Sequence, residues 1–192
     1  LLAHSQISAS SWVASCNWQA GKTTGCDLRH YANQRWQTAG LPADNTCITA
    51  LTTDKFGYLW VAAQGTLWRY DEKENSWAEF PAPLLDASTY MGFRYGAIRG
   101  LQAGADGAVW VLYELCGSAG CETRQIRYRL QFGLWYPMPD SSQVNAPRLL
   151  LDGQGNAFTL APGLIEQFDG RTFQPVASID WITATVDPTG NV

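Results

Sequence analysis

The sequence is poor in charge, in histidine and in long apolar runs, and each shortage excludes a class of protein. Charged residues make up 16% of the 192 residues and aromatic residues 12%, whereas an average globular domain carries about 25% charge. Disordered chains are rich in charge and poor in aromatics, so disorder is excluded. No apolar run reaches the roughly 20 residues that cross a bilayer, so we expect no membrane span in this chain. With three lysines, two histidines and a net charge of −4, the chain lacks a clustered basic face, so no nucleic-acid partner is expected.

Tryptophan, by contrast, is abundant, and most of the nine residues recur at a fixed spacing. Trp12, Trp60 and Trp110 lie 48 and 50 residues apart, and Phe158 follows after another 48. A second aromatic closes each unit, at Trp36, Trp77, Trp135 and Phe173. A period near this length is typical of β-propellers, whose unit is a four-stranded blade. We predict that Trp12, Trp60, Trp110 and Phe158 form the repeat core and fill the space between neighbouring blades.

The repeats predict an all-β chain, a β-propeller of four-stranded antiparallel blades. We place the blades at about residues 5–38, 47–80, 97–137 and 147–175, with a partial blade at 181–192. The partial fifth blade leaves the last repeat incomplete at Val192, so we expect the chain to be part of a larger propeller.

Basic residues alternate with apolar ones in the third strand of a unit. Arg127 and Arg129 alternate with Ile126, Tyr128 and Leu130, which predicts one apolar face and one solvated face rather than an anion site. His30 takes the corresponding place in the first unit. We expect it on a strand surface, in preference to a role as a catalytic base.

Residues 48–71 carry the pattern Ile-x-x-Leu-x-x-Asp-x-x-Gly-x-Leu-Trp, followed by Gly-x-Leu-x-Arg-Tyr-Asp. The pattern resembles the two-component regulator propeller repeat and returns at Ile98–Trp110 and Leu149–Asp169, while it weakens in residues 1–47. Related propellers with similar repeats include streptogramin lyases and quinone-cofactor dehydrogenases. The resemblance implies an extracytoplasmic propeller, often the sensory part of a hybrid histidine kinase. It implies no catalytic residue, because the motif is structural.

Four of the five cysteines occupy equivalent places in two units. We place them in the loop between the second and third strands, where facing strands bring Cα atoms to about 5.5 Å, and predict the disulfides Cys16–Cys26 and Cys116–Cys121. Two such bridges indicate an oxidising, extracytoplasmic location: periplasm, cell surface or secreted. The spacing lacks a Cys-x-x-Cys knuckle, so no metal is expected. The predicted bridges do not include Cys47. We expect it to be a buried thiol, and the alternative is a disulfide to another molecule.

No nucleophile elbow or phosphate-binding glycine loop is recognisable, so no catalytic residue and no cofactor are predicted. The longest insertion, Pro81–Ala97, is dense in aromatics, as interface cores are; the alternative is a loop packed on its own blade. Asn17–Thr24 is a second insertion. The candidate binding residues are Tyr90, Phe93, Arg94, Tyr95 and Trp18.

The preferred interpretation is a non-enzymatic extracytoplasmic propeller that acts as a protein–protein interaction scaffold in a larger assembly. Its partners would be other protein subunits or the remaining propeller blades. The first alternative is a sensor domain of a signalling receptor that binds a small molecule or glycan. The second is a propeller lyase or quinoprotein-type enzyme. This alternative is the weakest, because such enzymes need clustered histidines or acids at the axis and the chain has two isolated histidines.

Overall fold

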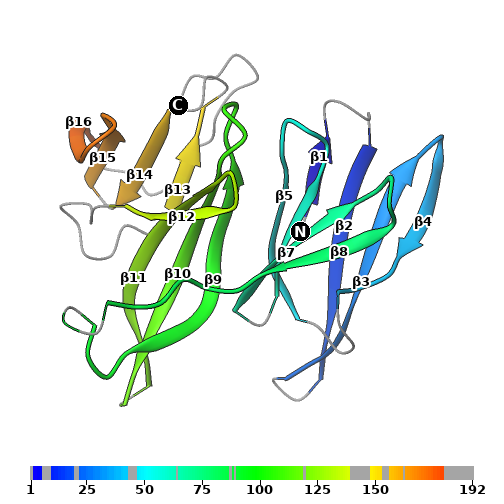
Figure 1. Ribbon diagram of the computed structural model, residues 1–192, viewed down its shortest axis with the longest axis horizontal. Helices are drawn as coiled ribbons and strands as arrows, with labels where there is room; N and C mark the ends of the chain where they lie inside the picture. The colour runs from blue at the N-terminus through cyan, green and yellow to red at the C-terminus, as the bar shows by residue number, and fades with distance from the viewer. Residues whose placement is uncertain are drawn as a thin grey trace. The chain divides into compact units, whose positions relative to one another are not determined.

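A computed structural model describes residues 2–5, 10–19, 22–42, 47–63, 65–86, 88, 90–118, 120–138, 148–152, 156–161 and 163–179. In these ranges the regular secondary structure is β-strand throughout, arranged as four four-stranded antiparallel sheets (Figure 1). The described residues contain no helix long and apolar enough to cross a membrane. The predicted all-β class and the four-stranded antiparallel unit are confirmed. The predicted partial blade at 181–192 lies outside the described residues.

The chain divides into two compact units, Leu1–Pro83 and Leu84–Val192. The first unit holds two sheets, each with its strands in sequence order. Their strands are β1 (Leu2–Ser5), β2 (Ser10–Gln19), β3 (Lys22–Ala32) and β4 (Arg35–Ala39), then β5 (Ile48–Thr53), β6 (Leu59–Ala63), β7 (Thr66–Asp71) and β8 (Ser76–Phe80). The first strands of the two sheets, β1 and β5, lie side by side.

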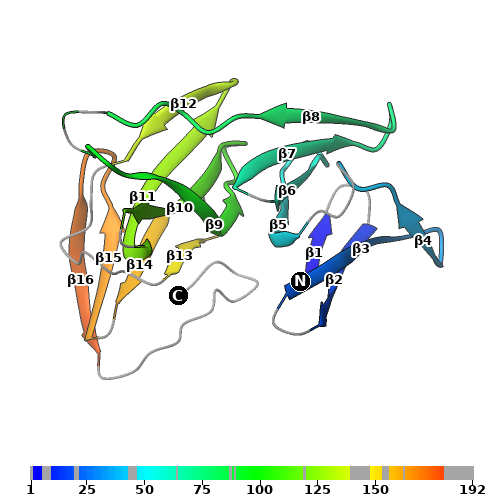
Figure 2. The same ribbon diagram turned by 90° about the horizontal axis from the view of Figure 1, so that it is seen from below.

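The second unit repeats this arrangement. Its strands are β9 (Arg94–Ala103), β10 (Val109–Gly117), β11 (Gly120–Gln131) and β12 (Leu134–Pro137), then β13 (Arg148–Leu151), β14 (Ala157–Ala161), β15 (Gly163–Phe168) and β16 (Phe173–Ile179). Here too the first strands, β9 and β13, are neighbours (Figure 2). Sheets that meet through their first strands in this way are typical of propeller blades around an axis.

The repeat tryptophans bridge successive sheets inside each unit. Trp12 is buried and meets Tyr70 of β7 edge-on, with ring centroids 5.5 Å apart. Trp110 is buried in the same way and meets Phe168 of β15 at 5.6 Å. Trp60 is also buried, whereas Phe158 is half-buried. Large rings thus occupy the space between sheets, where their burial contributes most to stability.

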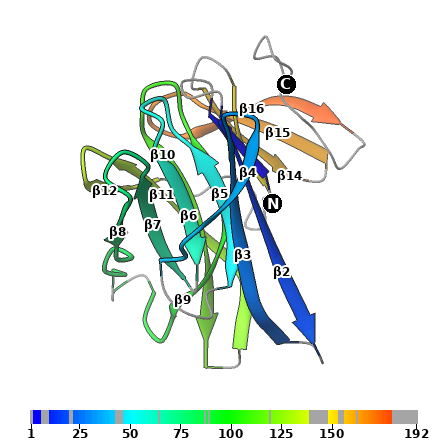
Figure 3. The ribbon, with the colours of Figure 1, turned by 90° about the vertical axis from the view of Figure 1, so that its right-hand side faces the viewer.

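The cysteines lie within strands, and the predicted loop position is wrong. Cys16 of β2 faces Cys26 of β3, because these two strands stay paired from Ser11 to Gln19 (Figure 3). The disulfide Cys16–Cys26 is present. Cys116 is also disulfide-bonded and its Cα faces that of Cys121. The side chain of Cys121 is outside the described residues, so that pairing stays a prediction.

Candidate functional site

A ring on the second strand of a sheet is paired with a basic side chain on the third. Trp12 faces His30 and Trp60 faces Arg69 in the strand registers. The imidazole of His30 stacks on Trp12 at 4.1 Å between ring centroids, and the Arg69 guanidinium lies 5.8 Å from the Trp60 ring. His30 is only 7% exposed. The predicted surface position of His30 is therefore wrong, because the second face of this strand is covered by the neighbouring sheet.

The same correction applies to the arginines of β11. Arg127 is 4% exposed, with its guanidinium 5.5 Å from the Phe173 ring of the next sheet. Arg129 faces Trp110 and donates a hydrogen bond to the Asp106 carboxylate. Partial burial raises the pKa of Asp106, but hydrogen bonds from the backbone of Ala108 and from Arg129 outweigh it and hold that pKa below its usual value. These basic groups therefore stabilise contacts between strands and sheets.

The acidic residue of the repeat turn is committed to structure as well. Asp54 is buried, and its Oδ1 accepts hydrogen bonds from the backbone N–H groups of Phe56 (2.9 Å) and Tyr58 (3.0 Å). Its Oδ2 accepts one from the indole N–H of Trp60 at 2.8 Å. Gly57 adopts a φ of 87°, which a residue with a side chain rarely adopts. One carboxylate thus closes the turn and orients the buried tryptophan.

Metal ions are held by sets of donor side chains that lie close together. No group of three or more His, Cys, Asp or Glu side chains suited to a metal ion occurs in that part of the chain.

The predicted binding residues fall into different environments. Tyr90 and Phe93 are half-buried in a turn, in which the N–H of Phe93 donates to the carbonyl oxygen of Tyr90 at 3.0 Å. Arg94 is exposed, and with Tyr95 it belongs to strand β9 rather than to the insertion. Trp18 lies on β2, and its side chain is outside the described residues. The structure therefore groups only the residues between Tyr90 and Tyr95, and their role in binding stays a prediction.

Tyr95 packs within its own sheet. Its ring lies 4.6 Å from that of Tyr113, and its hydroxyl donates to the hydroxyl of Tyr128 at 2.8 Å. Burial, followed by this hydrogen bond, raises the pKa of Tyr95 far above its usual value. Trp135 closes the cluster against Tyr113 and Tyr128. Tyr95 is therefore packed against its own sheet.

A different segment presents apolar side chains to solvent, namely the hairpin of β11 and β12. Phe132 is 90% exposed, Leu134 59% and Tyr136 43%. Leu134 and Tyr136 are two residues apart on β12 and so share one side of the sheet. We call Phe132, Leu134 and Tyr136 the hairpin face. A group of exposed apolar side chains on one short hairpin is typical of an interaction site.

The turn that carries Phe132 has an unfavourable sequence for its conformation. Phe132 and Gly133 have φ values of 52° and 77°, the signature of a two-residue type I′ turn. The matching turn of the first sheet has Asn33 and Gln34, at 51° and 62°. Asparagine tolerates a positive φ, whereas a bulky residue there is an outlier. An aromatic residue before glycine between two strands is the sequence signal that would have identified this site.

The comparisons with known proteins support the fold and leave the activity open. No protein-family model matches the sequence, and no curated protein matches it. Streptogramin B lyase is similar in structure, with a TM-score of 0.57 and 14% sequence identity. The similarity covers 93% of this chain and 53% of the lyase. The extracellular domain of a putative hybrid two-component system from B. thetaiotaomicron is also similar, with a TM-score of 0.57 and 14% identity. This similarity covers 99% of this chain and 23% of that domain's chain. Puromycin hydrolase is similar with a TM-score of 0.60 and 14% identity, over 97% of this chain and 29% of the hydrolase.

This chain thus spans about half the length of one of these proteins and under a third of the other two. The fold is that of part of a β-propeller. Proteins of similar fold include the extracellular domain of a putative two-component system, a lyase and a hydrolase.

Proposed function

We propose that this chain is part of a non-enzymatic, extracytoplasmic β-propeller scaffold that binds another protein through the hairpin face. The observation that carries the proposal is Phe132, an almost fully exposed aromatic held at a positive φ. A left-handed backbone costs about 1–2 kcal/mol for a residue with a side chain. Burial of the Phe132 ring does not offset this cost, and phenylalanine has no preference for such a turn. Contact of the exposed ring with a partner protein would give the residue a role that offsets the cost.

The chemistry of the hairpin face suits a protein partner. Two aromatic rings and a leucine supply apolar area with few rotatable bonds, as in the anchor residues of protein interfaces. On the same side of the sheet, Arg129 and Asp106 neutralise each other in an ion pair. The partner surface is therefore expected to be apolar and close to neutral. The disulfide Cys16–Cys26 supports an extracytoplasmic setting.

The test is Phe132→Asn, which gives this hairpin the residue that the first sheet has at Asn33. It is expected to raise the free energy of unfolding by about 1 kcal/mol, because the strain is relieved. It is also expected to weaken partner binding by about tenfold or more, the loss typical of an aromatic anchor. If Phe132→Asn is more stable than the wild type but binds the partner less tightly, misfolding cannot explain the weaker binding.

The assay is quantitative affinity capture from an extracytoplasmic extract, followed by titration of each captured protein. Trp36→Ser is the matched control, because Trp36 is an exposed aromatic (52%) on the outer strand of the first sheet. It should leave capture unchanged. Equal capture by the wild type and by Phe132→Asn would contradict the proposal.

The second candidate is a ligand-sensing propeller of a signalling receptor, supported by the resemblance of residues 48–71 to the two-component regulator propeller repeat. A kinase domain encoded in the same polypeptide would favour it.

A further inference from the structure

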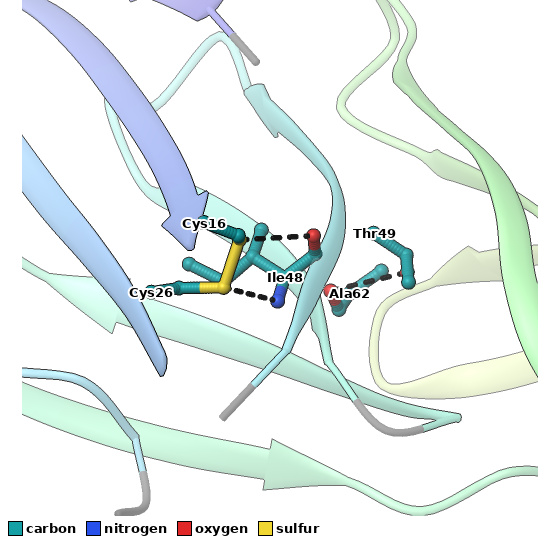
Figure 4. Close-up of a disulfide and its surroundings, with 5 residues drawn as sticks. All are labelled: Cys16, Cys26, Ile48, Thr49 and Ala62. Carbon is teal, nitrogen blue, oxygen red and sulfur yellow. Dashed lines mark hydrogen bonds between the residues drawn. A yellow bond between two sulfur atoms is a disulfide. The ribbon is translucent and has the colours of Figure 1, made fainter. Parts of the chain in front are cut away.

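The disulfide of the first sheet lies directly against the first strand of the second sheet. The backbone N–H of Ile48 donates to the Sγ of Cys26 at 3.3 Å, and the carbonyl oxygen of Ile48 lies 3.8 Å from the Sγ of Cys16 (Figure 4). Both sheets belong to the same compact unit. The bridge therefore runs alongside Ile48, with Cys26 at the amino side of that residue and Cys16 at its carbonyl side.

Cys47 is bonded to the nitrogen atom that contacts Cys26. Adding the two covalent bonds from this nitrogen to the Cα of Cys47, about 2.9 Å in all, to the 3.3 Å contact places that Cα within about 6 Å of the Cys26 Sγ. Because the chain passes Cys47 before Ile48, the backbone of Cys47 is on the amino side of Ile48, the side on which Cys26 lies. Cys47 is half-buried and is not in a disulfide.

This order makes Cys26 the nearer target for thiol–disulfide exchange. A thiolate attacks one sulfur of a disulfide, and the other sulfur leaves as a thiolate. An attack from Cys47 reaches Cys26 first, with Cys16 as the leaving group. Cys16 is also the more exposed of the two bridged residues, since Cys26 is 7% exposed and Cys16 is half-buried.

We propose that Cys16, Cys26 and Cys47 form a thiol–disulfide exchange site. The Cys47 thiol gives its proton to solvent, and its sulfur bonds to the Cys26 Sγ. The Cys16–Cys26 bond breaks, and its electron pair stays on Cys16, which takes up a proton. One S–S bond replaces another, so no oxidant or reductant is consumed. The product bridge joins β3 to the residue before β5, and thus ties one sheet covalently to the next.

The first experiment follows the bridge in the intact protein. Wild type and Cys47→Ser are incubated without added thiol, quenched in acid, labelled with N-ethylmaleimide, digested and mapped by mass spectrometry. In the wild type, the Cys26–Cys47 peptide and labelled Cys16 are expected together. Their initial rate of appearance should be higher at neutral than at acidic pH, because the thiolate is the nucleophile. Cys47→Ser should keep Cys16–Cys26 and show no labelled Cys16.

The second experiment tests which sulfur is attacked. Cys16→Ser and Cys26→Ser are matched variants, each left with Cys47 and one former bridge cysteine, and both are oxidised with oxidised glutathione. Bond formation to Cys47 should be about tenfold faster in Cys16→Ser, because the geometry favours Cys26. Equal rates in the two variants, or a wild type that keeps Cys16–Cys26 with labelled Cys47 at every pH, would overturn the proposal. The wild-type result holds even if these variants fold poorly. Neither experiment involves the hairpin face, so the two proposals stand or fall separately.

Discussion

Asp54 joins a turn to a buried ring, and the coupling between the two can be measured. Its carboxylate accepts two backbone hydrogen bonds and one from the indole of Trp60. A hydrogen bond to a charged group contributes about 1.5–3 kcal/mol, and a buried donor left without a partner costs about 1–3 kcal/mol. Asp54→Ala removes both acceptor oxygens and so all three hydrogen bonds, and we expect it to lower the free energy of unfolding by about 3–5 kcal/mol.

Asp54→Asn separates the ring contact from the turn. The amide keeps an oxygen for the turn but presents an NH₂ group to the indole N–H of Trp60, so two donors face each other. We expect a loss of about 2–3 kcal/mol. In a Trp60→Phe background the indole N–H is gone, and the same substitution should cost at least about 1.5 kcal/mol less.

The assay is urea unfolding of the four proteins of this double-mutant cycle, followed by tryptophan fluorescence and compared through midpoint and slope. Asp71→Asn serves as the control, because the Asp71 carboxylate accepts its hydrogen bonds from the backbone N–H groups of Lys73 and Glu74 in an exposed turn. It should cost less than about 1 kcal/mol. A coupling energy within about 0.5 kcal/mol of zero would refute the assignment of the Asp54–Trp60 bond as a stabilising contact.

Two further predictions concern the second unit. A β-carbon at Gly96 would lie 2.5 Å from the Sγ of Cys116, so Gly96→Ala should destabilise the protein by about 1–3 kcal/mol in thermal unfolding; Gly40→Ala, where a β-carbon meets nothing within 4 Å, is the control and should change little. The lowered pKa of Asp106 contributes stability that is present above its ordinary value of 3.8 and is lost as pH falls through the lower folded-state value. The melting temperatures of wild type and Asp106→Asn should therefore differ at neutral pH and converge as the pH falls below 3.8; a difference that is independent of pH would contradict this assignment.

The sheets can be predicted from the sequence because the spacing of the tryptophans and the alternation of apolar and polar residues can be read without knowing how the sheets pack. Trp12, Trp60 and Trp110 recur at the period of a blade, and Leu59–Ala63 is apolar on both faces and is buried at every position. The burial of His30 and Arg127 could not be predicted in the same way. Alternation shows which residues share a face, but it cannot show that a second sheet covers the face that carries the basic groups.

The candidate site was harder to predict, because hydrophobicity alone does not separate a buried ring from an exposed one. Tyr95 has the composition of a binding residue but packs within its sheet, against Tyr113 and Tyr128. For Phe132 the sequence offers only the glycine that follows it between two strands, whereas the case for binding depends on a backbone angle and an exposed fraction. Both are properties of the folded chain.

The disulfide between Cys16 and Cys26 also determines how the chain carries mechanical load. A force applied to the two ends passes through the S–S bond and bypasses the hairpin tip. The bridge spans ten residues of sequence, so about 35 Å of contour length stays hidden when the unit is pulled apart. A bridge from Cys26 to Cys47 spans 47 − 26 = 21 residues and would hide about 70 Å. The length released in a single-molecule stretching experiment would therefore report which of the two bonds each molecule contains.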